Sequence, residues 1–422
     1  MDFHVPAPVL TAVRLLDEAG FSAYPVGGCV RDTLLGTAPH DWDMCTSASP
    51  DEMHTVFKDF RTIDTGIRHG TVSVIIEGMQ LEITTFRTDG QYLDGRHPEN
   101  VTFSTRVEDD LMRRDFTVNA MALDTLNGQV IDLFGGQEDL KNRIIRCVGN
   151  AEERFTEDAL RILRALRFSA RLGFTIEEST AAAMLKLRNR LDLVSRERVA
   201  QELNGFLQAD RIGEKLLDQK EVLFAAIPEL RALDGCRDEA HPDSPDAWTY
   251  AARAVSLGAK DLTVRWALLL EKTEMAEQVM NSLKMPRRLT EDVCCLIACH
   301  NMLPTDESLW PLLAKLGEER FFRLMDVQEA DQKACDIPAH SQEIDFDRYR
   351  AEARHLLDSG ACMGLKDLAV KGSDLGRAGI TGPRIGITLH AMLRAVTRRE
   401  CENDKEALLR MLKEGKLSFR EE

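Results

Sequence analysis

Two aspartates lie two positions apart near the start of the chain, at Asp41 and Asp43 in the segment DWDMCT. In an extended strand, residues i and i+2 face the same side, so the two carboxylates should converge while Trp42 points away. Like charges held this close repel each other unless a cation intervenes, and carboxylate oxygens suit Mg²⁺. The pattern therefore indicates a metal site, with a solvated strand edge as the ordinary alternative.

A third carboxylate, Glu82, lies in a second strand-like segment, LEITTF. Its alternation puts Glu82, Thr84 and Phe86 on one face of a strand. A strand that follows a turn at Glu77-Gly78 could lie beside the strand of the two aspartates. Glu82 is then expected to join them as a catalytic group, although a single acid on a strand is more often a surface residue.

A glycine turn precedes both acidic segments, within Tyr24-Pro-Val-Gly-Gly-Cys-Val-Arg-Asp32. The pattern predicts a strand, a turn at Gly27 and Gly28, and then a helix. Glycines let backbone N–H groups approach a phosphate closely, and the start of a helix favours an anion. Arg31 follows one turn later and could bind the same anion. The alternative is a turn that only reverses the chain.

Arginines gather on one side of a helical segment at residues 157–172. The four on this side are Arg161, Arg164, Arg167 and Arg171, and the opposite side is apolar. Few acids lie at i±4 to balance them, so we expect an anionic partner such as a triphosphate or an RNA backbone. A solvated basic face is the alternative.

The elements that must position these residues change in type near residue 150. Strand-like segments are expected at residues 21–26, 41–46, 69–76, 79–86 and 129–134, interspersed with helices. Helical segments follow almost without interruption, at residues 157–172, 178–191, 196–208, 261–272, 319–332 and 383–399. We therefore expect an α/β region followed by an all-helical one, with turn-rich linkers at 234–247 and 335–347.

Composition narrows the possible partners of the chain. The 422 residues carry a net charge of −16, which disfavours non-specific coating of nucleic acid or anionic membrane but permits a local basic groove. Neither a membrane-spanning run nor a signal peptide is evident, so we expect a cytoplasmic protein. Ten irregularly spaced cysteines indicate reduced thiols. Their one cluster, Cys294, Cys295 and Cys299 beside His300, lies in an apolar helical run and is interpreted as core rather than metal site.

Two longer motifs complete the pattern. RRDFTVNA spans residues 113–120, and ERFTEDALRILRALRF spans residues 153–168. Together with the glycine turn and the aspartate pair, they resemble the class II tRNA nucleotidyltransferases, which are the CCA-adding enzymes and the related bacterial poly(A) polymerases. The run GPRIG at 382–386 is similar, more loosely, to the tail of the bacterial CCA-adding branch.

The resemblance implies a polymerase-β-like α/β head followed by an all-α neck, body and tail. The head would span residues 1–150, the neck with its nucleotide-recognition helix 151–210, the body 211–340, and the tail, which would bind the tRNA elbow, 341–422. The implied reaction is template-independent addition of CCA to the 3′ end of tRNA from CTP and ATP, with Mg²⁺ as cofactor. The partners implied are the tRNA acceptor stem and elbow; no protein partner and no membrane is implied.

The resemblance also implies roles for single residues. Asp41 and Asp43 would hold the metal with help from Glu82. The nucleotide-binding residues would be Gly28, Arg31, Arg113, Arg114, Asp158, Arg161, Arg164 and Arg167. The sequence does not decide which of Arg113 and Arg114 faces the nucleotide. Asp158 would accept the amino proton of cytosine or adenine while Arg161 donates to the ring nitrogen, a pattern that guanine and uracil cannot match.

Three alternatives share some of these motifs. A CC-adding or A-adding enzyme would have the same head, but the long charged segment at residues 87–98 resembles the loop of enzymes that add all three nucleotides. A bacterial poly(A) polymerase tends to carry a basic C-terminal extension, whereas this chain is acidic. A non-catalytic RNA-binding module would need a broken aspartate or RRD motif, and both are intact.

Overall fold

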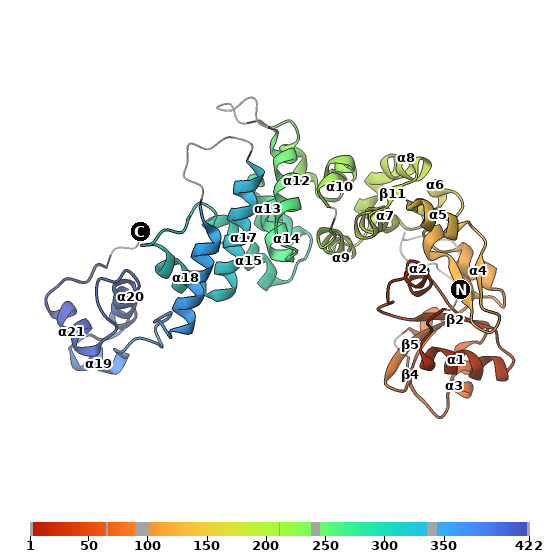
Figure 1. Cartoon of the computed structure of the whole chain (residues 1–422), viewed down its shortest axis with the longest axis horizontal. Coiled ribbons are helices and arrows are strands. Elements are labelled where there is room, and N and C mark those ends of the chain that lie inside the picture. Colours follow the sequence, from red (N-terminus) through yellow and green to blue (C-terminus); the bar gives the residue numbers. More distant parts are fainter. Residues whose placement is uncertain are drawn as a thin grey trace. The chain divides into compact units, whose positions relative to one another are not determined.

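The computed structural model describes residues 3–64, 66–89, 101–210, 212–237, 245–335 and 344–419. The chain forms two compact units, Met1–Arg231 and Ala232–Glu422 (Figure 1). The first unit contains all the strands of the described residues, and the described part of the second is helical. The predicted α/β region followed by a helical one is confirmed, except that the two-residue strand β11 (Thr175–Ile176) pairs with β10 (Ile144–Ile145).

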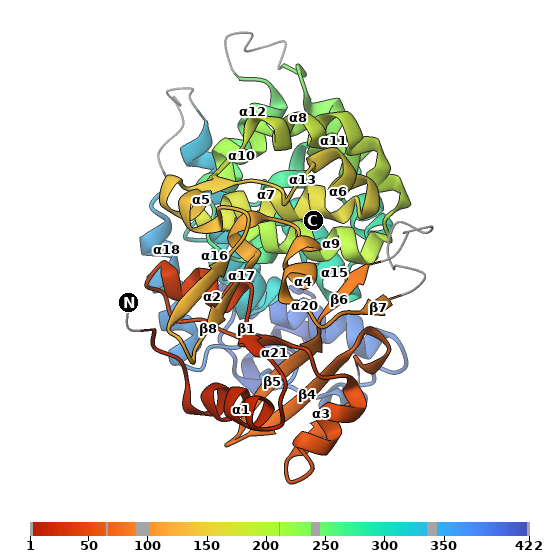
Figure 2. The ribbon, with the colours of Figure 1, turned by 90° about the vertical axis from the view of Figure 1, so that its right-hand side faces the viewer.

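A five-stranded mixed sheet lies at the centre of the head, in the order β1-β2-β5-β4-β3. Its strands are β1 (Ala23–Pro25), β2 (Asp43–Thr46), β3 (Arg61–Ile63), β4 (Thr71–Ile76) and β5 (Met79–Thr85). β2 and β5 pair in parallel, and the other pairs are antiparallel. Helices α1 (Ala7–Glu18) and α3 (Pro50–Val56) pack against this sheet (Figure 2).

Short elements surround the sheet and hold the motif residues. The strand pairs are β6 (Arg87–Asp89) with β7 (Val101–Phe103) and β8 (Met121–Asp124) with β9 (Gln129–Asp132). The helices are α2 (Gly28–Leu34), α4 (Val107–Met112), the 3₁₀ turn η2 (Thr117–Asn119) and α5 (Gly136–Asn142). A small apolar cluster joins the glycine turn, β2, the residue after β5, α4 and β8 in one core; its members are Val26, Cys45, Phe86, Leu111 and Ala122.

Each of the five predicted strand segments contains an observed strand. One expectation about their bounds is wrong, because β2 begins at Asp43 and leaves Asp41 in the preceding loop. The physical reason is the register: Asp43 opposite Glu82 is the first pair between β2 and β5, and neither neighbouring strand pairs with residues before it. The two aspartates therefore do not alternate along one strand.

Helices complete the first unit. They are α6 (Ala151–Glu157), α7 (Leu160–Leu172), α8 (Glu178–Leu187), α9 (Arg196–Leu207), α10 (Ile212–Asp218) and α11 (Lys220–Ala226). The helix expected at 157–172 is interrupted at Asp158, which adopts an extended backbone with φ −138° and ψ 102°. Its Oδ1 accepts a hydrogen bond from the Leu160 backbone N–H at 3.0 Å, which caps the start of α7. Asp158 thus lies between two helices.

The second unit is built of helices with two cores. Its α-helices are α12 (Ala247–Leu257), α13 (Leu262–Leu270), α14 (Ala276–Ser282), α15 (Arg287–Cys299), α16 (Leu309–Leu316), α17 (Glu318–Ala334), α18 (Phe346–Asp358), α19 (Gly372–Arg377), α20 (Arg384–Thr397) and α21 (Lys405–Lys413). Trp248, Trp266 and Phe321 are fully buried in the first core. The second core consists of apolar residues from Cys362 to Leu417.

The remaining expectations of the sequence concern linkers, thiols and membranes. The predicted linkers at 234–247 and 335–347 lie partly outside the described residues. All ten cysteines are unpaired, which confirms the expectation of free thiols. Within the ranges that the structure describes, no helix combines the length and the apolar character that crossing a bilayer requires.

Candidate active site

The acidic part of the site lies on two neighbouring parallel strands, where the start of β2 meets the middle of β5. Asp43 and Glu82 are direct partners in the register of β2 and β5, so their side chains leave the same face of the sheet side by side. Both residues reach solvent, although surrounding protein atoms partly desolvate the Asp43 carboxylate. Asp41 lies just before β2 with its side chain 82% exposed, and its Oδ1 is 3.0 Å from Nδ1 of His40. The sheet thus brings together Asp43 and Glu82, with Asp41 next to them in the chain.

The Asp43 carboxylate lies in an unfavourable electrostatic environment. Burial by surrounding atoms is the main cause that raises the pKa of Asp43, and repulsion from Glu82 comes next. Arg114 opposes these effects, and Asp41 raises the pKa further. A divalent cation would relieve the repulsion that the two neighbouring acids create, so the acids fit a metal site.

A second group of metal-ligand types lies elsewhere. Among the described residues, Glu271, His300 and Asp331 in the second unit have ligand atoms within 4.8 Å of one another. His300 bridges the two acids, with Nδ1 3.5 Å from Glu271 and Nε2 3.3 Å from Asp331. Because each ring nitrogen faces a different carboxylate, an imidazole ring between two acids accounts for this group without a metal. The acids Asp41, Asp43 and Glu82 of the head are less tightly grouped than these three residues, because the Asp41 side chain contacts His40.

The glycine turn packs directly against the RRD motif. Gly27 has φ +81°, a backbone conformation that favours glycine, and a Cβ at this position would lie 2.8 Å from Nη1 of Arg114. The Gly27 N–H donates to the Met121 carbonyl at 3.1 Å, and the Val26 N–H donates to the Asp43 carbonyl at 2.9 Å. The turn, the Asp43 strand and Arg114 are therefore held together by backbone contacts.

Arg31 is more deeply embedded than the sequence suggests. The residue is only 5% exposed. Its Nη1 donates to Oδ1 of Asn119 at 2.6 Å, and its Nη2 lies 2.7 Å from Oδ1 of Asp32. The guanidinium also lies over the ring of Phe168 in α7, 5.4 Å from its centroid. Arg31 thus ties α2 to η2 and to α7, and its phosphate-binding role stays a prediction.

Both arginines of the RRD motif are bound to one buried acid, Asp110. Nε and Nη2 of Arg113 lie 2.9 and 2.7 Å from Oδ1, and Nε and Nη2 of Arg114 lie 3.3 and 3.0 Å from Oδ2. The Asp110 side chain is 0% exposed. This fork was not evident from the sequence, because a run of three acids in the first turn of a helix usually faces solvent.

The arginines of α7 find acidic partners within the protein. Arg161 pairs with Glu157 at 2.7 Å, and Arg164 pairs with Asp115, also at 2.7 Å. Arg167 pairs with Glu202 at 2.6 Å. The expectation that these arginines lack opposing acids is therefore wrong. Glu157, at i−4 from Arg161, was visible in the sequence, whereas Asp115 and Glu202 come from distant segments.

Asp158 and Arg161, the pair expected to select the base, each bind other residues of the protein. Oδ2 of Asp158 accepts from Nη2 of Arg198 in α9 at 2.8 Å. Arg161 is 8% exposed, and its Nη2 donates to the Arg113 carbonyl at 3.0 Å. The backbone of the RRD motif is thus in direct contact with the proposed recognition residue. Arg198 had no signal in the sequence beyond its place in a helical segment.

The charged segment at residues 87–98 is described only in part. Arg87 in β6 donates from Nη1 to the carbonyl of His69. Residues 90–98 lie outside the described part of the chain. The expectation that this segment is a loop linked to full CCA addition therefore stays a prediction.

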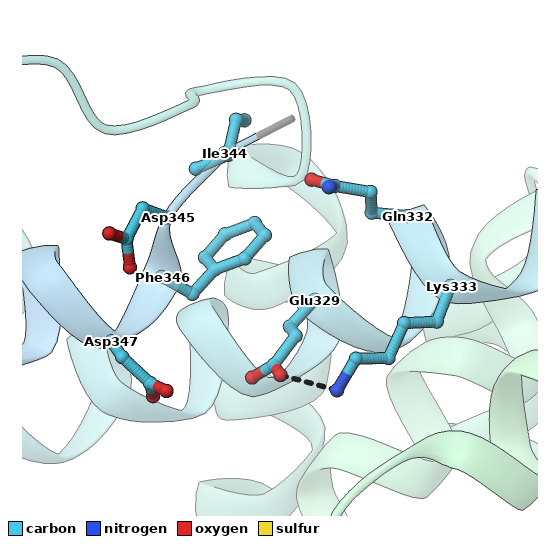
Figure 3. A pocket seen from close by; sticks show the side chains of 7 residues that line it. All are labelled: Glu329, Gln332, Lys333, Ile344, Asp345, Phe346 and Asp347. Carbon is cyan, nitrogen blue, oxygen red and sulfur yellow. Dashed lines mark hydrogen bonds and ion pairs between the residues drawn. The ribbon is translucent and has the colours of Figure 1, made fainter. Parts of the chain in front are cut away.

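A pocket of about 380 Å³ lies in the second unit, between the end of α17 and the start of α18 (Figure 3). Lys333 points toward Glu329 and forms an ion pair with it, and Arg350 binds both Glu329 and Asp347. Its lining residues are Glu329, Gln332, Lys333, Ile344, Asp345, Phe346 and Asp347. Glu329 and Asp347 thus have basic partners, and Asp345 caps the start of α18, so the pocket does not offer the chemistry of the head.

Comparison with known families gives three matches along the chain. Residues 23–146 match the Poly A polymerase head domain, and residues 173–233 match a probable RNA and SrmB-binding site of polymerase A. Residues 259–412 match the putative tRNA nucleotidyltransferase domain 2. The first match includes the acidic strands, the glycine turn and the RRD motif.

Curated relatives and solved structures are similar over nearly the full length. A CCA-adding enzyme of Leuconostoc mesenteroides is 36% identical over 96% of this chain and 95% of its own length. One from Geobacillus kaustophilus is 38% identical over 96% of both chains. The crystal structure of Bacillus stearothermophilus CCA-adding enzyme in complex with CTP superposes with a TM-score of 0.82, at 32% identity and 98% coverage of both chains. A Thermotoga maritima CCA-adding enzyme complexed with tRNA shares the fold at 21% identity, with a TM-score of 0.64.

Proposed function

The chain belongs to the CCA-adding enzymes, the class II tRNA nucleotidyltransferases, and on this premise we propose that it adds C, C and A to the 3′ end of tRNA. The substrates are CTP and ATP, each addition releases pyrophosphate, and no nucleic-acid template takes part. The observation that carries the proposal is similarity to CCA-adding enzymes over 96% of the chain. The match to a Poly A polymerase head favours poly(A) synthesis as the second candidate.

The acidic strands of the head are the proposed catalytic centre. Asp43 and Asp41 hold Mg²⁺, and Glu82 assists from the adjoining strand. The raised pKa of Asp43 supports this role: burial is its main cause, and the next cause, repulsion from Glu82, is one that a cation would remove. Mg²⁺ bound there would activate the 3′-hydroxyl of the tRNA and neutralise the triphosphate. The protein contributes the alignment of the carboxylates, which the parallel register of β2 and β5 fixes.

The nucleotide is proposed to bind between the glycine turn and α7. The backbone around Gly28, together with Arg113 and Arg114, binds phosphates, and Arg114 is favoured as the arginine that faces the reacting groups. Two observations support this choice. Arg114 lies against Gly27, and its positive charge lowers the pKa of Asp43. Arg31, Arg164 and Arg167 set the position of α7 through Asn119, Asp115 and Glu202.

Base selection is proposed to rest on Asp158 and Arg161. A carboxylate can only accept and a guanidinium can only donate, which matches the pairing edges of cytosine and adenine and opposes those of guanine and uracil. Each of the two side chains has an ion-pair partner that supports a fixed position: Arg198 binds Asp158, and Glu157 binds Arg161.

We propose that the chain acts on tRNA in the cytoplasm and that four consecutive parts of it have different roles. Residues 1–150 carry out the chemistry, and residues 151–210 select the base. Residues 211–340 support the acceptor stem, and residues 341–422 bind the elbow. The separate apolar core of the tail residues supports treating them as a module of their own.

The test is incubation of the purified chain with tRNA that lacks its terminal CCA. CTP alone should add two residues, and CTP with ATP should complete CCA, as read by sequencing gel. A product that stops at CC with both nucleotides would identify a CC-adding enzyme. A long tail from ATP alone would identify a poly(A) polymerase.

A further inference from the structure

We propose that Asp110 is a positioning residue that sets both arginines of the RRD motif for nucleotide binding. The inference rests on the proposed function, since it takes the nucleoside triphosphate as the ligand of Arg113 and Arg114. Asp110 itself would contact neither substrate nor metal. Its effect would pass entirely through the two guanidinium groups.

The geometry around Asp110 is that of a buried two-way fork. One carboxylate oxygen binds Nε and Nη2 of Arg113, and the other oxygen binds Nε and Nη2 of Arg114, at 2.7 to 3.3 Å. Each guanidinium therefore presents the same edge to the acid. Within the described residues, Nη1 of neither arginine has a hydrogen-bond partner, so an edge of each stays available to a ligand.

The charge balance of the fork favours an anionic ligand. A single carboxylate faces two guanidiniums, which leaves one net positive charge. Burial would raise the pKa of Asp110, but Arg114 and Arg113 lower it, so the acid stays ionised. Its surroundings are apolar, with Leu111 fully buried beside it and the buried Cys45 nearby. A buried ionised acid is costly without its partners, which indicates that the three groups act as a unit.

The fork lies between the other parts of the proposed nucleotide site. Nη1 of Arg114 lies next to the position of a Cβ on Gly27, at the turn that would cradle the phosphates. The carbonyl of Arg113 accepts a hydrogen bond from Arg161, which belongs to the proposed base-selecting pair. Asp110 thus fixes two residues that lie between the glycine turn and the start of α7: Arg114 beside Gly27, and Arg113 with its carbonyl on Arg161.

Loss of this acid should weaken the binding of every nucleotide equally. Without Asp110, two adjacent arginines repel each other, and each regains the rotamers that the fork restricts. An asparagine at this position could accept from one arginine through Oδ1 but would turn donor N–H groups toward the other. Because triphosphates of CTP and ATP are identical, the loss should not depend on the base.

The experiment compares Asp110→Asn with Asp109→Asn, its neighbour in the same helix. Asp109 bonds to the Ser104 hydroxyl and to neither arginine among the contacts of the structure, so it controls for removing an acid from α4. We measure KM and kcat for CTP and ATP, and CTP binding by calorimetry. D110N should raise KM and the CTP dissociation constant by about 10- to 100-fold, with a smaller change in kcat. D109N should resemble wild type, as should the C-over-U preference of D110N.

A double-mutant cycle separates positioning from a merely structural role. In an Arg114→Gln background, D110N should raise KM by a smaller factor than in wild type, because part of its action is already gone. Equal factors in both backgrounds would overturn the proposal, and so would unchanged KM in D110N. Where D110N does not fold, Asp110→Glu serves the same comparison, since it keeps the charge but displaces both guanidiniums. Failure of wild type to extend tRNA would instead count against the proposed function.

Discussion

At the residue scale, Asp43 shows a conflict between stability and chemistry. Its carboxylate lies beside Glu82 on the same face of the sheet, and burial and this neighbour raise its pKa. A raised acid pKa means that the group contributes stability only below its unfolded pKa and loses that contribution as pH rises through its folded pKa. At neutral pH, Asp43 is therefore a cost to folding, which a bound cation would remove.

The first prediction is that Asp43→Asn loses nucleotide addition without losing stability. Removing a metal ligand should lower kcat by roughly 1000-fold, because the metal supplies several kcal/mol of charge stabilisation. Thermal unfolding without metal should occur at or above the wild-type temperature, since the repulsion with Glu82 is gone. Addition of Mg²⁺ should raise the unfolding temperature of wild type but not of the variant.

Asp41→Ala is the companion variant for this prediction. Its side chain is exposed and makes no core contact, so the fold and the affinity for tRNA should be retained while nucleotide addition fails. Turnover like that of wild type in either variant would contradict the metal-binding role. Equal stabilisation of wild type and D43N by Mg²⁺ would place the ion elsewhere.

The second prediction concerns Gly27. An alanine there would face both a backbone with φ +81° and the nearby Nη1 of Arg114. Such a backbone conformation costs a non-glycine residue about 1–3 kcal/mol. We expect Gly27→Ala to lower stability by that amount and also to raise KM for both nucleotides, because Arg114 is displaced. Gly36→Ala, with φ +72° and no neighbour within 4 Å, is the matched control and should change stability alone.

The sequence predicts which acids lie near each other on the sheet, but it does not predict the partners of the arginines. The pairing of two strand segments was correctly expected to bring Glu82 beside Asp43, whereas the alternation expected to join Asp41 to Asp43 fails because β2 begins at Asp43. The partners of the arginines depend on contacts between segments that are distant in sequence, such as Arg164 with Asp115. For that reason the charge balance of α7 could not be derived from spacing on one helix.

At the element scale, the break between α6 and α7 decides how the base-selecting residues are presented. Asp158 has an extended backbone, caps α7 and is held by Arg198, while Arg161 lies within the first turn of α7. A continuous helix was expected because alanine, leucine and arginine all favour one. The cap interaction of Asp158 overrides that tendency. Helix propensity therefore predicts the presence of the helix but not its start.

The third prediction tests the pair at this break. Asp158→Ala and Arg161→Ala should each lower the preference for CTP over UTP, and for ATP over GTP, by about 10- to 100-fold, because each removes one partner that distinguishes the bases. Incorporation of all four nucleotides is measured at each step on tRNA that lacks CCA, CC or only A. Glu178→Ala, in the first turn of α8, controls for surface changes in the same region. Unchanged discrimination in both variants would show that other residues select the base.

At the scale of the whole molecule, the two units differ in how they hold buried charge. In the second unit, His300 lies between Glu271 and Asp331, with Lys272 and Tyr250 also at this cluster. Burial would lower the pKa of His300, but the hydrogen bond to Asp331 and the charge of Glu271 raise it. A raised histidine pKa contributes stability fully below the unfolded pKa, and this is lost as pH rises through the folded pKa.

The fourth prediction follows from that sign. Stability of the second unit should fall as pH rises above neutrality, and His300→Gln should remove most of this dependence. Denaturant unfolding of the full chain, followed by tryptophan fluorescence from pH 6 to pH 9, measures it, because Trp248, Trp266 and Trp310 lie in this unit. His355→Gln, at an exposed position in α18, serves as the control. A pH slope that is the same in wild type and H300Q would contradict the role of the cluster.

The tail has a core of its own, which fixes where the chain can be cut. The buried members of that core extend from Cys362 to Leu417, and Trp310 of α16 packs against its edge and donates to the Cys362 carbonyl at 3.0 Å. A cut near Leu365 would pass through this core. A cut after Gly360 removes it whole.

The last prediction is that a chain ending at Gly360 keeps its chemistry and loses affinity for tRNA. The head and the helices up to α9 contain every proposed catalytic and base-selecting group, so CCA addition to a short acceptor-stem minihelix should be unchanged. Full-length tRNA should show a raised KM, because most of the residues proposed to bind its elbow are gone. Trp310→Phe in the full chain controls for disturbance of the exposed edge. Equal losses on minihelix and tRNA would show instead that the tail supports the folding of the body.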